Sequence, residues 1–382
     1  MSHASAGVTV RPVNGRAELR RFLDVPFDIY RDDPNWVAPL YVERVRHLDP
    51  RRNPYFQHAE AIFFLAWRNG VPVGRISAQL DRLHLERHKD GAGQFGCLEA
   101  VNDAQVFAAL VDAAAAWLAR RGATRMRGPF TLSINDETGL LVDGFDRPPS
   151  VMMGHARPYY GPRLEALGFT KAKDLFAYDY DMTQPIPQHM AAVVDKALNN
   201  GALQIRPLSK RHLDRDLSII MDIFNDAWAD NWGFVPLTQA ETAMLGQTLR
   251  ALVGEDYVAI ASWRGEPAAM AVTLPDINRA IHDLGGRLVP FGWAKLLWRV
   301  FARPPAAVRM PLMGVRKAYQ RSATGSTLAL GVIFRIREAH LKRGVTRAEL
   351  SWILEDNLAM RRMIEAMGAV AYKTYRVYER AL

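Results

Sequence analysis

Residues 309–334 read RMPLMGVRKAYQRSATGSTLALGVIF, which is an apolar run, then a loop of small and hydroxylated residues, then a longer apolar segment. After the loop, Leu328, Val332 and Ile336 recur at helical spacing, so we expect a strand, a loop and a helix in that order. The first amides of a helix have no acceptor within the helix, and the positive end of the helix dipole lies there. Because small side chains let a ligand approach these amides, the segment predicts an anion site whose expected occupant is a pyrophosphate.

The second half of the chain repeats the first half. VRPV at residues 10–13 matches IRPL at 205–208, and LAWRNGVPVG at 65–74 matches IASWRGEPAA at 260–269. Near the ends of the halves, EALG precedes Phe169 and EAMG precedes Ala369. The matches keep their order and an offset of roughly 195 to 200 residues, which indicates two copies of one structural unit rather than coincidence among common dipeptides.

Each copy shows the same order of expected elements: a strand, helices that carry an Asn-Trp pair, two strands joined by a turn, a helix, a strand, a short helix and a last strand. This order predicts the α/β (α+β) class, with two tandem domains that are each a mixed twisted sheet flanked by helices. The expected first domain is 1–182, and MTQPIPQHM begins a linker and helix at 183–203. The expected second domain is 204–382, with an apolar insertion at 276–306.

Composition restricts the partners and the compartment. The chain has 382 residues, of which 49% are hydrophobic, and this suits two buried cores. Cys97 is the single cysteine, and no histidine pair has metal-ligand spacing, so we expect neither a disulfide nor a metal. The N-terminal residues resemble no leader and no stretch is apolar enough to span a membrane, so we expect a cytoplasmic protein. A net charge of +9, with Arg316, Lys317 and Arg321 near the loop, favours an anionic partner.

The loop resembles a known phosphate-binding signature. Gln320-x-x-Ala323-x-Gly325 is similar to the Q/R-x-x-G-x-G/A signature of the GCN5-related N-acetyltransferase (GNAT) superfamily, with alanine at its first glycine position. The text that follows at residues 349–369, ELSWILEDNLAMRRMIEAMGA, resembles that superfamily's strand, asparagine, helix and closing glycine. Asn357 matches the asparagine.

This resemblance implies an N-acyltransferase with acyl-CoA as a substrate and without a metal. It places the pantetheine arm along the strand that ends at Val315 and near Asn357. Many of these enzymes have a tyrosine acid where this chain has Ile364, so Tyr372, Tyr375 or water would protonate the thiolate, or it would leave unassisted. The residues that would hold the pyrophosphate are Gln320, Arg321, Ser322, Ala323, Thr324, Gly325 and Ser326.

The first copy lacks a loop of this kind. Its counterpart helix begins at Asn102 and Asp103, and an acidic start of this kind would repel a pyrophosphate. We therefore assign acyl-CoA to the second copy and the shaping of the acceptor pocket to the first.

Candidate proton acceptors come from two segments. Amide formation needs an unprotonated amine, so a carboxylate, a histidine or water must accept a proton. Asp136 and Glu137 are two candidates, in a turn of SINDETGLLVDGF, and Asn135 before them is a candidate substrate ligand. The alternative interpretation of this segment is an Asx-type turn with solvated carboxylates. Glu355 and Asn357 are candidate catalytic residues from the second segment. The alternative interpretation of Glu355 is that it caps a helix.

Two aromatic segments are candidates for the acceptor site. NDAWADNWGFVP at residues 225–236 places Asn225, Trp228 and Asn231 near the expected acceptor site, with core packing of Trp228 as the alternative. The insertion carries Trp293 and Trp298, and its basic residues Lys295, Arg299 and Arg303 recur every four residues. Such a helix lies in a membrane interface or covers a pocket as a lid, and either arrangement would shield an apolar acyl chain.

Taken together, these segments resemble the bacterial ceramide synthase group. The resemblance implies transfer of a long acyl chain from acyl-CoA to the amine of a lipid such as a sphingoid base. The insertion, if it lies in a membrane interface, would bring the protein to the inner membrane surface. Acetyl transfer to a small soluble amine or peptide is an alternative, although it would need no apolar insertion. A non-catalytic acyl-CoA-binding protein is another. Nucleic-acid binding is not expected, because no recognised module is present.

Overall fold

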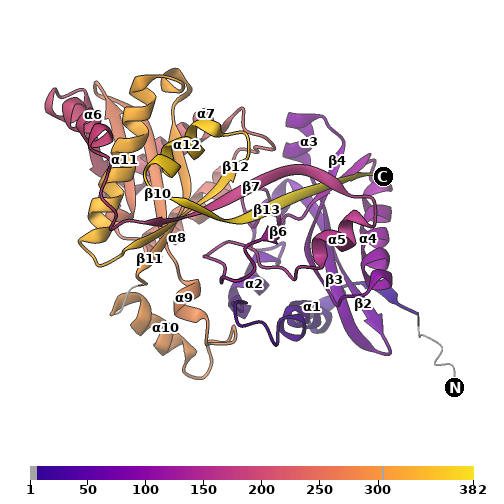
Figure 1. Cartoon of the computed structure of the whole chain (residues 1–382). Coiled ribbons are helices and arrows are strands. Elements are labelled where there is room, and N and C mark those ends of the chain that lie inside the picture. Colours follow the sequence, from indigo (N-terminus) through magenta and orange to yellow (C-terminus); the bar gives the residue numbers. More distant parts are fainter. Residues whose placement is uncertain (1–6, 303–304) are drawn as a thin grey trace. The chain divides into compact units, whose positions relative to one another are not determined.

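The computed structural model describes residues 7–302 and 305–382, and these form two compact units (Figure 1). Unit 1 contains the chain up to Leu175 together with Ile281–Trp293 and Lys373–Leu382. Unit 2 contains Phe176–Ala280 and Ala294–Tyr372. Each unit is a mixed sheet flanked by helices, so the predicted α/β fold class is confirmed.

Unit 1 is a twisted sheet in which β4 and β5 run parallel and the other described neighbours run antiparallel. Its strands follow the order β1 (Thr9–Pro12), β2 (Ala59–Arg68), β3 (Val71–Asp81), β4 (Ala92–Ala100), β5 (Arg125–Gly128) and β13 (Val370–Ala381), with β6 (Leu140–Asp143) also paired to β13. Its helices are α1 (Gly15–Ile29), α2 (Tyr41–His47), the 3-10 helix η1 (Pro54–Gln57), α3 (Arg82–His88), α4 (Ala104–Ala119) and α5 (Tyr160–Glu165).

Two helices of unit 1 cover opposite faces of the sheet. The Arg75 guanidinium lies over the Phe22 ring of α1, 4.9 Å from its centroid. A Cβ added to the neighbouring Gly74 would meet Leu110 of α4 at 2.9 Å. Because successive residues of a strand point to opposite faces, α1 and α4 sandwich the sheet.

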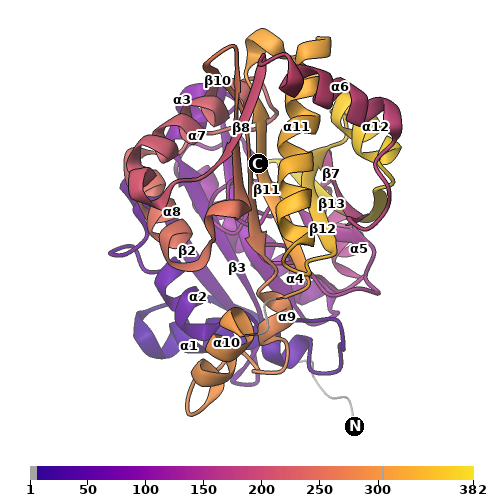
Figure 2. The ribbon, with the colours of Figure 1, turned by 90° about the vertical axis from the view of Figure 1, so that its left-hand side faces the viewer.

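Unit 2 repeats this architecture, with α7 (Leu213–Trp228) packed on β10 and β11 and α11 (Ala323–Leu341) packed along the sheet (Figure 2). Its strands follow the order β12 (Arg347–Leu354), β11 (Ala307–Val315), β10 (Glu266–Pro275), β9 (Val258–Trp263) and β8 (Leu203–Pro207). Its other helices are α6 (Gln188–Asn199), η2 (Lys210–His212), α8 (Gln239–Leu252), η3 (Glu255–Tyr257), η4 (Lys317–Tyr319) and α12 (Leu358–Ala366). The insertion holds α9 (Asn278–Ile281) and α10 (Gly292–Phe301).

The last strand of each repeat contributes to the unit built mainly from the other repeat. In unit 1, β13 pairs with β5, with Tyr378 opposite Gly128. In unit 2, residues 176–181 of β7 (Thr170–Asp181) lie beside β12, where Arg347 is ion-paired with Asp179. Each sheet is therefore completed by residues that are distant in the sequence.

Within the described residues, no helix combines the length and the apolar character that a membrane span requires.

Candidate active site

Two neighbouring parallel strands of unit 2 separate part-way along their length. β11 pairs with β12 from Ala307 opposite Arg347 to Met310 opposite Leu350. On its other side β11 stays paired with β10 as far as Val315. Among the described residues, the last five residues of β11 therefore have one edge without a strand neighbour, although Trp228 and Gln320 donate to the main-chain oxygens of Met313 and Val315. An extended ligand can bind to such an edge through main-chain hydrogen bonds.

The loop after β11 forms the N-terminus of α11, as the sequence predicts. Ser322 is the N-cap, and its side-chain oxygen accepts a hydrogen bond from the Gly325 amide at 3.1 Å. Within the described part of the chain, the amides of Arg321, Ser322, Ala323 and Thr324 have no acceptor. These amides and the helix dipole give an anion site at the helix start.

The loop conformation explains two of its residues. Arg321 has a φ of 57°, a left-handed conformation that costs a non-glycine residue about 1 kcal/mol or more. A Cβ at Gly325 would lie 2.1 Å from the carbonyl oxygen of Tyr319. Only glycine fits at this position, so the last glycine of the signature is required by the loop itself.

The polar side chains around the loop differ in whether neighbouring groups of the protein already bind them. Arg316 is ion-paired with Asp222 at 2.5 Å, and Lys317 with Asp230 at 2.6 Å, so neighbouring carboxylates offset both positive charges. The Gln320 side chain donates to the main-chain oxygens of Ala227 and Val315 and so anchors the loop. Arg321 is exposed and has no ion-pair partner among the described residues. It is the cation best placed to reach a ligand.

A buried polar cluster lies where β11 and β12 separate. Glu349 is 5% exposed, and its carboxylate accepts hydrogen bonds from the Ser351 hydroxyl at 2.7 Å and from the Tyr372 hydroxyl. Arg309, fully buried and opposite Glu349 in the strand register, donates to the Ser351 hydroxyl at 3.0 Å and forms an ion pair with the Glu349 carboxylate at 3.7 Å. The Trp352 ring lies 4.4 Å from this guanidinium.

Glu349 is not among the catalytic residues predicted from the sequence. Glu349 and Ser351 alternate with the apolar residues Ala348, Leu350 and Trp352, and this alternation is the sequence pattern that indicates them. Buried polar groups of this kind are satisfied by partners, and a buried carboxylate at a strand divergence is a candidate for chemistry.

The candidates at the end of β12 have structural contacts. Asn357 caps α12, because its side-chain oxygen accepts from the Met360 amide at 3.3 Å. The carbonyl oxygen of Glu355 accepts from Arg361 at 2.9 Å. Ile364 is buried in the core of unit 2, and Tyr375 is buried in unit 1, where it donates to the Gly154 oxygen. Of the two tyrosines considered as acids, Tyr372 is the one that reaches the cluster.

The aromatic segment that begins in the last turn of α7 packs against β11. The Trp228 indole donates to the Met313 oxygen at 2.9 Å and lies 4.9 Å from the Phe224 ring. Asn231 forms a turn in which its amide donates to the Trp228 oxygen. The side-chain oxygen of Asn225 is buried and has no partner among the described residues. These contacts give Trp228 a packing role and leave Asn225 available for a polar ligand.

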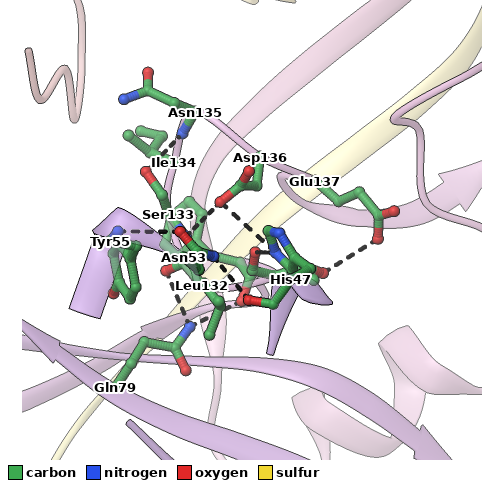
Figure 3. Close-up of polar contacts among 12 residues, drawn as sticks. His47, Asn53, Tyr55, Gln79, Leu132, Ser133, Ile134, Asn135, Asp136 and Glu137 are labelled. Atoms are coloured by element: carbon green, nitrogen blue, oxygen red, sulfur yellow. Dashed lines mark hydrogen bonds and ion pairs between the residues drawn. The ribbon is translucent and has the colours of Figure 1, made fainter. Parts of the chain in front are cut away.

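The polar turn of unit 1 is held by helix α2 (Figure 3). Glu137 is ion-paired with Arg44, and although burial would raise its pKa, the guanidinium holds the pKa of Glu137 below its usual value. Asp136 accepts from the Ser133 amide at 3.2 Å and lies 3.9 Å from the His47 ring. The Asn135 amide donates to the Ser133 hydroxyl. Arg44 therefore favours the charged form of Glu137, and Asp136, which lies near His47, is the more exposed of the two carboxylates.

In unit 1, the places that correspond to the open strand edge and the helix start of unit 2 are occupied by the chain itself. Its parallel strands separate after Gln94 and Arg127, but the Phe130 amide then donates to the Phe95 oxygen at 2.7 Å, so the chain itself fills the gap. A Cβ at Gly96 would lie 1.6 Å from the Phe130 oxygen, which shows how close this approach is. The first amides of α4 are capped by the carboxylate of Asp103. Neither a pantetheine arm nor a pyrophosphate has an open place there.

Unit 1 also holds a largely buried carboxylate whose pKa is raised. Burial raises the pKa of Glu99 to about 7, although its carboxylate accepts from the hydroxyls of Tyr30 at 2.7 Å and Tyr160 at 2.6 Å. Nearby, His155 is hydrogen-bonded to Asp33 at 3.0 Å, and burial lowers the pKa of His155.

Glu99 gives a pH-dependent prediction for stability. Its folded pKa of about 7 exceeds the usual value of 4.5 for a glutamate, so between these values the native state holds a proton that the unfolded state has lost. Stability therefore falls as the pH rises through this range, by at most about 3 kcal/mol. The unfolding temperature of Glu99→Gln minus that of the wild type should be larger at pH 8 than at pH 5, because only the wild type carries the destabilising charge at pH 8. Equal differences at both pH values would contradict the raised pKa.

The aromatic residues of the insertion are exposed. Trp293 is 54% and Trp298 is 51% exposed, and both lie on α10. Arg303, the last residue of the expected basic stripe, lies outside the described residues.

Comparison with known proteins identifies the family. No family model matches the chain. The chain is 46% identical over 379 residues to the bacterial ceramide synthase of Caulobacter vibrioides (strain NA1000 / CB15N), covering 99% of this chain and 98% of that protein. The chain belongs to the bacterial ceramide synthase family. It is also 43% identical over 374 residues to protein YghO of Escherichia coli (strain K12), covering 98% and 95% of the two chains.

Solved structures confirm the fold expected for this ceramide synthase family member. The tandem GNAT protein from the clavulanic acid biosynthesis pathway matches with a TM-score of 0.57 at 13% identity, covering 98% of both chains. A GCN5-related N-acetyltransferase from Sphaerobacter thermophilus matches with a TM-score of 0.54 at 12% identity, covering 98% of this chain and 95% of that one. The tandem GNAT fold predicted from the repeat and the loop is confirmed.

Membership in the ceramide synthase family also confirms the expected enzyme class, an N-acyltransferase.

Proposed function

We propose that the protein transfers a long acyl chain from acyl-CoA to the amine of a lipid, such as a sphingoid base. The observation that carries the acyl-CoA part is the contrast between the two units. In unit 2 the start of α11 has amides without acceptors, and β11 has an open edge. In unit 1 a carboxylate and the chain itself occupy the matching places. The lipid acceptor is supported by the relative named bacterial ceramide synthase.

The proposed site binds acyl-CoA in an extended form. The pyrophosphate lies on the amides of residues 321–324, where Arg321 adds a cation. The pantetheine arm follows the open edge of β11 toward Met310, and the thioester then lies beside the cluster around Glu349. Asn357 follows the neighbouring strand; its side-chain oxygen caps α12, and its side-chain NH2 group can still donate to the same arm.

In this site Glu349 is the proton acceptor. The ammonium group of the acceptor gives one proton to the Glu349 carboxylate, and the freed lone pair attacks the thioester carbonyl carbon. The C–S bond then breaks, the second nitrogen proton passes to the CoA thiolate, and an amide and free CoA result. The hydroxyls of Ser351 and Tyr372 hold the carboxylate in place. The proton on Glu349 returns to solvent after product release.

A direct assay tests this function. Purified protein is incubated with palmitoyl-CoA or acetyl-CoA against sphinganine, 3-oxosphinganine and water-soluble amines, and free thiol is measured. We expect turnover of palmitoyl-CoA with the sphingoid bases to exceed any acetyl transfer at least tenfold. Turnover confined to acetyl-CoA and soluble amines would instead support the small-amine alternative, and calorimetric binding of CoA without turnover would support a binding protein.

A further inference from the structure

The segment around α10 concentrates the exposed apolar side chains of the molecule. Fourteen large hydrophobic residues of the described chain are exposed, and five of them lie between residues 289 and 298. These five are Val289 at 83%, Phe291 at 79%, Trp293 at 54%, Leu297 at 49% and Trp298 at 51%. Single exposed apolar residues are ordinary on a protein surface, but a contiguous group of this kind indicates a binding surface.

The charge of this segment indicates what it binds. Residues 284–308 contain no aspartate or glutamate, and their charged residues are Arg287, Lys295, Arg299 and Arg303. Of these, Arg287 and Lys295 are exposed beside the apolar group, whereas Arg299 is half-buried and donates to the Ala280 oxygen at 2.6 Å. Exposed aromatic residues interspersed with cations complement a surface that is apolar below an anionic layer.

We propose that residues 287–298 bind an anionic lipid bilayer, with the aromatic side chains inserted among the headgroups. With ten residues α10 is about 15 Å long, which is too short to span a bilayer but enough to lie in its interface. Trp293 and Leu297 are one helical turn apart, and so are Ala294 and Trp298, so one broad face of α10 carries the exposed apolar residues. This inference goes beyond the proposed chemistry, because it concerns where the enzyme is held and not what it transfers.

A vesicle-binding experiment on the full-length protein tests the proposal. The probes are vesicles of phosphatidylcholine alone and vesicles with about 30% phosphatidylglycerol, and bound protein is measured by co-sedimentation. We expect the wild type to bind the anionic vesicles, with weaker binding to the neutral ones and at high salt. The Trp293→Ser/Trp298→Ser double variant should bind at least tenfold more weakly. Lys295→Gln should bind more weakly and with a smaller dependence on salt.

Matched controls separate the segment from surface hydrophobicity in general. Val71→Ser and Val193→Ser remove exposed apolar side chains, 58% and 47% exposed, from β3 and α6, and should bind as the wild type does. Thermal unfolding checks that each variant is folded, and Lys295→Gln tests the proposal if the double variant is unstable.

Three results would overturn the proposal. The first is a wild type that fails to bind the anionic vesicles, and the second is a folded double variant that binds as tightly as the wild type. The third is a concentration-dependent dimer, seen by light scattering, that the double variant abolishes, because the surface would then join two copies of the chain. Vesicle binding is measured without substrate, so a failure of the proposed acyl transfer would be distinguishable from a failure of this inference.

Discussion

Replacing Ser322 by aspartate should weaken CoA binding, measured by calorimetry, about 100-fold or more. Aspartate is as good an N-cap as serine, so α11 should keep its first turn. The new carboxylate would accept hydrogen bonds from the amides of Thr324 and Gly325 at the helix start, where it would repel the pyrophosphate. Two unit charges about 4 Å apart interact by about 4 kcal/mol near a protein surface, so a loss of two or more orders of magnitude is expected. Unit 1 already carries this arrangement, because Asp103 caps α4.

The uncharged analogue is the matched control for this variant. Ser322→Asn also supplies a capping oxygen but no charge, so it should bind CoA within a few-fold of the wild type. The unfolding temperatures of both variants should stay within a few degrees of the wild-type value. If the folded aspartate variant binds CoA as tightly as the wild type, the pyrophosphate is held somewhere other than the start of α11.

The fold and the loop were predictable because their signals are local or repeated. The small residues at 322–326 and the helical spacing of the apolar residues after them lie within one short segment, and the structure has β11 ending at Val315 and α11 starting at Ala323. The internal repeat then extends the same architecture to the first half. Neither inference needs any knowledge of which residues meet across the chain.

The roles of the candidate catalytic carboxylates could not be predicted in the same way, because they depend on contacts between residues that are far apart in the sequence. Arg44 neutralises Glu137 from 93 residues away, so nothing in the turn itself distinguishes Glu137 from a free carboxylate. Tyr372 reaches Glu349 across 23 residues, and Arg309 lies 42 residues before Ser351. The exchange of last strands between the repeats likewise has no local signal, because β5 and β13 become neighbours only in the folded chain.

Glu349→Gln should lower kcat by a factor of about 100 to 10,000, the range usual for loss of a general base. Glutamine keeps the shape of the side chain and can still accept from the Tyr372 hydroxyl, but it cannot take a proton from the ammonium group. It also removes the charge paired with the buried Arg309, so thermal unfolding must show that the variant is folded. Acyl-CoA affinity should stay near the wild-type value, since the pyrophosphate lies on the start of α11. Turnover and calorimetric CoA binding, measured on the same preparation, separate these two effects.

The pH profile distinguishes a proton acceptor from a residue that only supports the strand. As the pH rises, a growing fraction of the amine is already unprotonated, so the loss of kcat in Glu349→Gln should become smaller, whereas a structural defect should persist at every pH.

Two further variants serve as comparisons. Tyr372→Phe removes a hydroxyl that holds the carboxylate, and a smaller loss of kcat is expected. Glu338→Gln removes an exposed carboxylate of α11 that is paired with Lys342, and it should leave kcat unchanged. A folded Glu349→Gln variant with a kcat within threefold of the wild type at neutral pH would assign the proton to another group, and Asp136 with His47 would be the next pair to test.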